Sequence, residues 1–186
     1  MAAPARGDPA NTKAQSEAMR VQILDQEIAA LVDPALEPLI SDAQHASIRN
    51  SEKETSLKLY HEANAAHGLK PDDRFEILPL KKGKVWLCQF ERRLEERCAT
   101  LRLKVVSYSL QLAMGENDKD RLRQYVESRA RLRFEYQTMR RFWILKKNYL
   151  QEKEKLASGT RKLSYGQMVM RWQALQGYGG NGSRSN

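Results

Sequence analysis

Residues 87–150 read LCQFERRLEERCATLRLKVVSYSLQLAMGENDKDRLRQYVESRARLRFEYQTMRRFWILKKNYL. Apolar side chains recur there in steps of four and three residues on both sides of Gly115. The first row is Leu87, Leu94, Cys98, Leu101, Val105, Tyr108 and Leu112, and the second is Leu122, Tyr125, Leu132, Tyr136, Met139, Trp143 and Leu150. Such spacing places one apolar row along each of two helices, and each row must be buried against another part of the protein or a partner.

The two rows are separated by a short break at residues 114–118. Gly115 suits a left-handed helix cap, and Asn117 or Asp118 suits the N-cap of the next helix. Because a connection this short favours antiparallel neighbours, we predict an all-α fold with an antiparallel, coiled-coil-like helical hairpin over residues 85–157. The pattern leaves open whether the two rows pair within one chain or between two chains.

The remainder of the chain divides by composition and by helix-breaking residues. A first helix is expected to stop before Pro34, and Gly68 is a credible end for the helical part that follows. That part begins either at a capping box at Ser51–Glu54 or near residue 38 as one continuous helix. The predicted segments are a disordered N-terminus at 1–12, an acidic helical segment at 13–68, a linker at 69–84, a short C-terminal helix at 158–177 and a flexible tail at 178–186. Within the linker, a short extended segment is expected at 75–80 and a turn at 81–84.

Charge is distributed unevenly along the chain. Residues 1–80 hold 8 Lys and Arg against 13 Asp and Glu, whereas residues 81–186 hold 24 against 10. The N-terminal part is therefore acidic and the C-terminal part strongly basic. Either the two parts dock on one another, or the basic part binds a polyanionic partner.

Composition also limits the compartment. No apolar run approaches the roughly 20 residues that cross a bilayer, so we expect no membrane span. The N-terminus lacks the apolar core of a signal peptide. Cys88 and Cys98 lie about 15 Å apart along one predicted helix, too far for a disulfide. We therefore expect an intracellular protein of the cytoplasm or nucleus, with the mitochondrial matrix also compatible.

No arrangement of residues typical of catalysis is recognisable. His61 and His67 are six residues apart and diverge around a helix, so they do not match the helical zinc motif. Neither cysteine has a histidine nearby, and Cys98 falls on the apolar row, where a small buried hydrophobe is the default. We predict no enzyme activity, no catalytic residues, no metal site and no cofactor.

The second arm of the hairpin is rich in arginine. Arginine binds phosphate and carboxylate bidentately, so this arm could bind RNA, DNA or an acidic protein. The candidate polyanion-binding residues are Arg121, Arg123, Arg131, Arg133, Arg140, Arg141, Lys146 and Lys147. Because Arg129 and Lys146 interrupt the apolar row, each is alternatively expected to extend to solvent or to pair with Glu91, Glu95 or Glu96 across the hairpin.

The second arm also has more apolar residues than one partner helix can cover. Phe134 and Phe142 lie off the row, so a third element or another chain must cover them. The candidate protein-interface residues are Phe134, Phe142, Trp143, Tyr149, Met168 and Trp172. We expect a helical scaffold or adaptor subunit whose protein partner offers an acidic surface or an apolar groove. Self-association is compatible with this pattern. The alternative is a nucleic-acid-binding protein of a ribonucleoprotein or chromatin complex.

Overall fold

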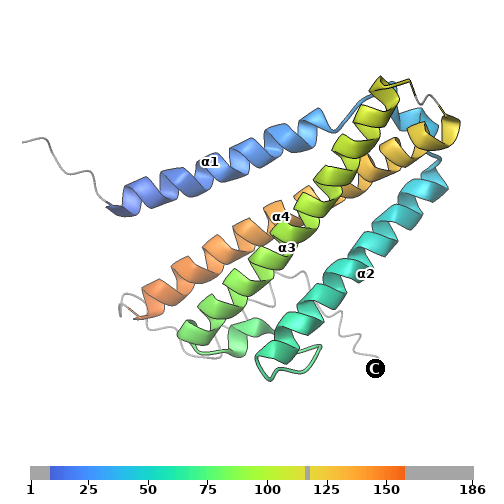
Figure 1. The fold of residues 1–186 in the computed structure, drawn as a ribbon. Helices are drawn as coiled ribbons and strands as arrows, with labels where there is room; N and C mark the ends of the chain where they lie inside the picture. The colour runs from blue at the N-terminus through green and yellow to red at the C-terminus, as the bar shows by residue number, and fades with distance from the viewer. Residues whose placement is uncertain (1–8, 116–117, 158–186) are drawn as a thin grey trace, which may run out of the picture. The chain divides into compact units, whose positions relative to one another are not determined.

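The computed structural model describes residues 9–115 and 118–157. Within these ranges the chain is all-helical, with four α-helices and no strand, which confirms the predicted all-α class (Figure 1). The chain forms two compact units, residues 1–146 and 147–186. The second unit is described only over the last turns of the fourth helix. The predicted C-terminal helix at 158–177 and tail at 178–186 lie outside the described residues.

The acidic N-terminal part forms two helices joined by a tight connection. Helix α1 spans Pro9–Ala30, a single turn η1 spans Glu37–Leu39, and α2 spans Asp42–Ala66. The N-terminus of α2 is fixed by a capping box, in which Ser41 accepts from the Gln44 backbone N–H and the Gln44 side chain accepts from the Ser41 N–H. Gly68 follows α2 with a φ of 71°, as expected of a glycine that ends a helix.

Two sequence expectations are corrected in this part. Residues 9–12 were expected to be disordered, but α1 begins at Pro9, where a missing N–H costs no helical hydrogen bond. Of the two alternatives for α2, the continuous helix is correct, since Ser51 lies inside it. A serine with a glutamate three residues on predicts a helix start only where the chain is not already helical.

The linker expectation is also wrong in its second half. Residues 75–77 form a 3₁₀ turn, η2, rather than an extended segment, and α3 runs from Leu80 to Ala113, so the predicted turn at 81–84 is helical. Pro79 is the N-cap of α3, and its carbonyl accepts the first helical hydrogen bond from Gly83 at 2.9 Å. Pro79 therefore lies at the start of a helix and not within an extended segment.

Helix α4 spans Lys119–Ala157 and follows α3 after a short connection. Gly115 has a φ of 91°, the left-handed conformation predicted for it. Side chains of α3 and α4 are in contact: the ring centroids of Phe90 and Phe142 lie 5.2 Å apart, and the Arg102 guanidinium donates to the Tyr136 hydroxyl at 2.6 Å.

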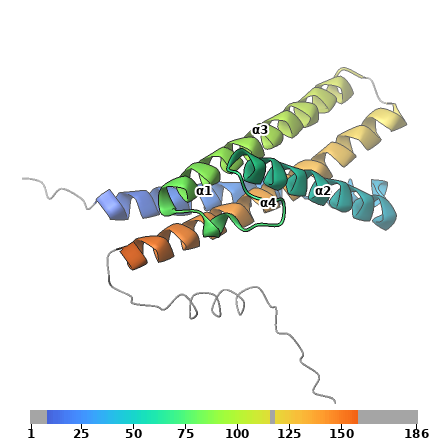
Figure 2. The ribbon, with the colours of Figure 1, turned by 90° about the horizontal axis from the view of Figure 1, so that it is seen from below.

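In the first unit, side chains of α1 and α2 both contact α3 and the part of α4 up to Lys146. The course of these helices can be followed in Figures 1 and 2. Aromatic packing anchors α2 to the start of α3. The Trp86 ring stacks on Phe75 at 4.3 Å and on Phe90 at 5.1 Å, and Tyr60 of α2 meets it edge-on at 5.2 Å. Trp86, Leu87, Leu94 and Leu101 are almost fully buried. The predicted row of α3 therefore faces the core of this unit.

No helix in the described ranges combines the length and apolarity that a bilayer crossing requires.

Candidate protein-interaction surface

The acidic N-terminal helices and the basic α3 and α4 are joined by ion pairs. Glu27 pairs with Arg102, Glu37 with Arg133, Glu62 with Arg93 and Asp25 with Arg140. Of the two alternatives that the uneven charge suggested, docking of the two parts on one another is therefore realised within the first unit. Because solvent screens exposed ion pairs, these pairs orient α1 and α2 more than they stabilise them.

One cluster of charges is buried. The Glu52 carboxylate of α2 accepts from Arg97 at 2.6 Å and from Arg131 at 2.5 Å, and its side chain has no exposed surface. The equally buried Glu135 lies 3.8 Å from the Arg97 guanidinium. Burial raises the pKa of Glu135, and the neighbouring Glu52 carboxylate raises it in the same direction, to about 8. Burial alone would raise the pKa of Glu52, but the neighbouring Glu135 carboxyl and the hydrogen bonds from Arg97 and Arg131 hold it below its ordinary value. The pair therefore carries one shared negative charge at neutral pH.

This assignment predicts a pH-dependent effect of Glu135→Gln. The pKa of Glu135 is about 8 in the folded chain, against an ordinary value of 4.5. Between pH 4.5 and pH 8, Glu135 is therefore protonated in the folded chain and ionised in the unfolded chain. The stabilising contribution of protonated Glu135 is fully present below pH 4.5 and is lost as the pH rises through 8. Glutamine mimics the protonated group, so Glu135→Gln should be more stable than wild type at pH 9 by roughly 2–4 kcal/mol, and nearly equal at pH 5. Urea unfolding at both values, with Glu127→Gln as the control, measures this. An equal effect of Glu135→Gln at the two values would contradict it.

A second buried polar side chain holds the segment between α2 and α3. The Asn64 Nδ2 donates to the carbonyls of Lys70, Pro71 and Asp73 at 3.1, 3.1 and 2.8 Å, and Asn64 Oδ1 accepts from the Trp86 indole N–H at 3.0 Å. Asn64 therefore ties three carbonyls of this segment to α2, in addition to the Asp73 N–H that donates to the Lys70 carbonyl and the Tyr60 hydroxyl that donates to the Asp73 carbonyl. It is a positioning residue for the α2–α3 pair.

The candidate polyanion-binding residues are largely occupied by partners within the chain. Arg131, Arg133 and Arg140 hold the pairs with Glu52, Glu37 and Asp25 described above. Lys146 pairs with Glu91, as expected from its place on the apolar row. Arg123 pairs with Glu127 within α4, and the Arg121 guanidinium lies 5.8 Å from the Tyr108 ring. Arg141 and Lys147 are exposed on α4.

Arg129, the other basic interruption of the row, donates to the Ala30 carbonyl at 3.1 Å and to the Tyr125 hydroxyl at 2.9 Å. The acidic residues of α3 named as its alternative partners are bound by others. Glu91 and Glu95 each accept from Arg20 of α1 at 3.3 Å. Glu96 accepts from Arg92 at 3.0 Å.

The candidate interface residues lie in different surroundings. Phe142 is buried against Phe90, and Phe134 is half-buried on α4. Trp143 is half-buried, with the Arg20 guanidinium 4.4 Å from its ring centroid. Tyr149 lies in the second unit, where the Lys153 ammonium is 5.6 Å from its ring. Met168 and Trp172 lie outside the described residues. The expectation that Phe142 needs a third element or another chain is wrong, because Phe142 packs on Phe90 of α3. Trp143, a member of the predicted row, contacts Arg20 of α1 instead.

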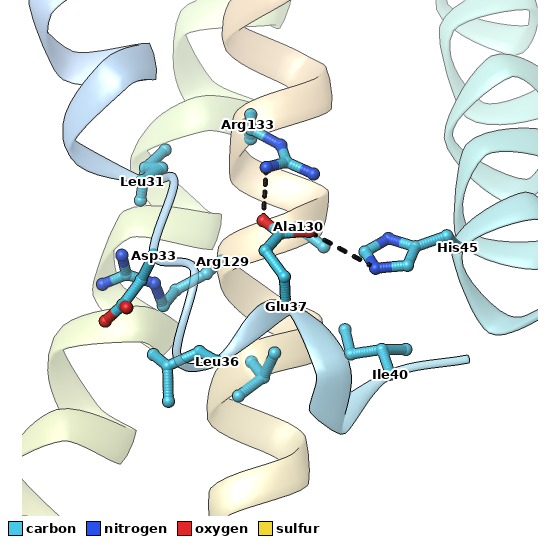
Figure 3. Close-up of a pocket in the computed structure, with 10 residues that line it drawn as sticks. Leu31, Asp33, Leu36, Glu37, Ile40, His45, Arg129, Ala130 and Arg133 are labelled. Atoms are coloured by element: carbon cyan, nitrogen blue, oxygen red, sulfur yellow. Dashed lines mark hydrogen bonds and ion pairs between the residues drawn. The ribbon is translucent and has the colours of Figure 1, made fainter. Parts of the chain in front are cut away.

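Figure 3 shows a pocket where the connection between α1 and α2 meets α4. Glu37 lies at its centre, accepting from Arg133 at 2.6 Å and lying 3.6 Å from the His45 Nε2. Ile40 and Val126 form a small apolar cluster beside it. The pocket encloses about 10 Å³, room for about one water molecule, so it cannot hold an organic substrate. Its polar groups fix the connection onto α4.

The groups considered for covalent or metal chemistry are placed as follows. Cys98 is buried, and burial raises the pKa of its thiol to about 12, so it stays protonated. His67 shares a hydrogen bond of 3.0 Å with Gln89, while His45 lies near Glu37. No three metal-binding side chains gather among the residues that the structure describes.

A row of exposed apolar side chains lies on the C-terminal half of α3. Leu103, Val106, Leu110 and Met114 are 71%, 49%, 59% and 81% exposed. Their steps of three and four residues place them on one face, opposite the row of Leu101, Val105, Tyr108 and Leu112. We call these four residues the α3 stripe. Figure 2 shows this half of α3 at the margin of the described helices, with none of them on its outer side.

The α3 stripe is not among the interface residues predicted from the sequence, although its apolar periodicity is present there. Residues 99–114 contain two apolar rows on opposite faces, and only the row continuing from Leu94 belongs to the predicted hairpin. The same outward face is polar earlier in α3, where Arg92 pairs with Glu96 at 3.0 Å. A helix that becomes apolar on both faces along its length predicts contacts on both faces.

No family model, curated protein or solved structure matches the chain.

Proposed function

We propose that this protein is a helical scaffold or adaptor subunit without enzyme activity, and that it binds a protein partner through the α3 stripe. The observation that carries the proposal is the exposure of Leu103, Val106, Leu110 and Met114 along one helix face. Single exposed apolar residues are ordinary on protein surfaces, but a contiguous row of them is typical of an interface.

The spacing of the stripe favours a partner helix or groove. Four apolar residues at three- and four-residue steps cover about three helical turns, or about 17 Å of helix. This is the pattern by which amphipathic helices are recognised. Covering the stripe would remove four large side chains from water, each contributing on the order of 1 kcal/mol or more on burial.

Lengthwise pairing of α3 and α4 as a hairpin is part of this proposal, because it determines which face of α3 is left for a partner. It is supported by the antiparallel order of the Phe90–Phe142 and Arg102–Tyr136 contacts and by the Glu91–Lys146 ion pair. If α4 lies along the inner row of α3, the α3 stripe faces away from it.

Nucleic-acid binding through α4 is the alternative function, and the contacts within the chain favour it less. Arg131, Arg133 and Arg140 would each have to leave a carboxylate to meet phosphate. Binding that depends on phosphate contacts weakens steeply with salt. Arg141 and Lys147, both exposed, are the residues that such binding would use first.

The proposal is tested by co-purification from an extract of cells that express the protein. The amount of the specific protein partner that co-purifies with the tagged double variant Leu103→Asp/Leu110→Asp should be at least about tenfold lower than with the wild type. The reason is that charged groups cannot enter an apolar interface without a large desolvation cost. The control Leu57→Asp, on an equally exposed leucine of α2, should retain the partner. Both variants should keep the wild-type helix content by circular dichroism.

Nuclease treatment separates the two functions. The proposal predicts that the partner stays bound to the wild type after nuclease and that Arg141→Ala/Lys147→Ala has no effect. Loss of all bound material on nuclease treatment, or retention of the partner by the α3 variant, would contradict the proposal.

A further inference from the structure

We infer that the segment docking on the α3 stripe is an amphipathic helix whose apolar face is flanked by acidic residues. This inference rests on the proposed function and names the chemistry of the partner. Its basis is the charge of α3 around the stripe.

The C-terminal half of α3 contains no acidic residue. From Arg97 to Gly115 there are three basic residues, Arg97, Arg102 and Lys104, and the last acid before them is Glu96, which is paired with Arg92. Arg97 forms an ion pair with Glu52. Arg102 donates to the Tyr136 hydroxyl and forms an ion pair with Glu27. Lys104 is exposed one residue after Leu103, so its ammonium is placed to meet a partner carboxylate at the edge of the stripe. Complementary charge at an interface rim selects the partner and fixes its register.

A second copy of the chain fits this surface less well. Its own stripe would bring the same basic segment and no carboxylate to pair with Lys104. Each chain also has a net charge of +9, so two copies repel one another before contact. An acidic helix removes both costs.

A lipid surface also fits less well. Helices that lie on anionic membranes carry several basic residues along their polar face. Around the stripe the uncharged polar positions are Thr100, Ser107, Ser109 and Gln111. The exposed bases are Lys104 and Arg102, and Arg102 is paired with Glu27. The uncharged side chains suit the rim of a protein interface.

The inference is tested with two labelled 14-residue peptides and the full-length protein. Both peptides carry leucine at positions matching the stripe, but one has glutamate and the other lysine at the flanking positions. At about 50 mM salt, where surface charges are weakly screened, fluorescence anisotropy should show the glutamate peptide binding about fivefold more tightly, the upper range for exposed charge pairs. Leu110→Asp should weaken binding of the glutamate peptide by at least tenfold, while Leu57→Asp should not.

Charge reversal provides the decisive control. Lys104→Glu should abolish or invert the preference between the two peptides without changing helix content. Equal binding of the two peptides to wild type would overturn the inference. Two other results would also overturn the acidic helix. If sedimentation shows a concentration-dependent dimer of the wild type that is absent in Leu110→Asp, the stripe binds a second copy of the chain. If the wild type binds vesicles with 30% anionic lipid and Leu110→Asp does not, the stripe binds a membrane.

Failure here is distinguishable from failure of the proposed function. If Leu103→Asp/Leu110→Asp loses its co-purifying protein but neither peptide is preferred, a protein partner remains and its acidic character is rejected. If the double variant keeps its co-purifying protein, the stripe is not the interface and both proposals fail.

Discussion

Replacing Glu52 by alanine should destabilise the first unit by roughly 3–5 kcal/mol, the cost typical of breaking a buried ion pair from one side. Glu52 is fully buried and accepts from both Arg97 and Arg131. Its removal leaves two guanidinium groups beside Glu135 as the remaining carboxyl. Urea unfolding followed by tryptophan fluorescence measures the loss, and Glu54→Ala on the exposed face of α2 is the matched control. A difference below about 1 kcal/mol between the two variants would contradict the buried cluster.

The same cluster should behave non-additively. In Glu52→Gln, Glu135 no longer faces a neighbouring negative charge, so its pKa should fall and it should ionise beside Arg97. Glu135→Gln alone leaves Glu52 to carry the charge. The double variant Glu52→Gln/Glu135→Gln removes both carriers, so its cost should exceed the sum of the single costs. Additive costs would mean that the two carboxyl groups do not share one charge.

The second large effect is expected for Asn64→Ala, which should cost about 2–4 kcal/mol, because the buried Trp86 N–H loses its acceptor and the carbonyls of Lys70, Pro71 and Asp73 each lose one donor. The measurement is the free energy of unfolding, together with the rate of proteolysis within residues 67–74. That rate should rise because the Asn64 contacts to Lys70, Pro71 and Asp73 hold the segment. Asn50→Ala, at an exposed position of the same helix, should leave both quantities near their wild-type values. Unchanged protease resistance in Asn64→Ala would show that the loop is held by other contacts.

The sequence predicted those features that depend on local rules. The apolar row of α3, the glycines at 68 and 115 and the burial of Cys98 follow from periodicity and from the conformational freedom of glycine. The Glu91–Lys146 pair is one of the outcomes that the sequence left open for Lys146. Each of these depends on a short stretch of chain or on one helix pair.

Features that depend on three helices at once were not predictable from the sequence. Glu52 and Glu135 look like ordinary solvated charges on helix surfaces, and only the meeting of α2, α3 and α4 buries them together. Asn64 likewise acquires its role from a loop that folds back onto it. The arginines of α4 could be read as a polyanion site because the carboxylates that pair with them lie 79 to 115 residues away in the sequence.

The central claim, that a protein partner covers the α3 stripe, is tested most directly by site-specific photocrosslinking. A photoreactive amino acid at position 110 should give one discrete protein adduct that resists nuclease, whereas the same residue at position 57, also exposed in the free chain, should give none. The absence of a protein adduct at position 110, or adduct formation of equal strength at both positions, would contradict the account.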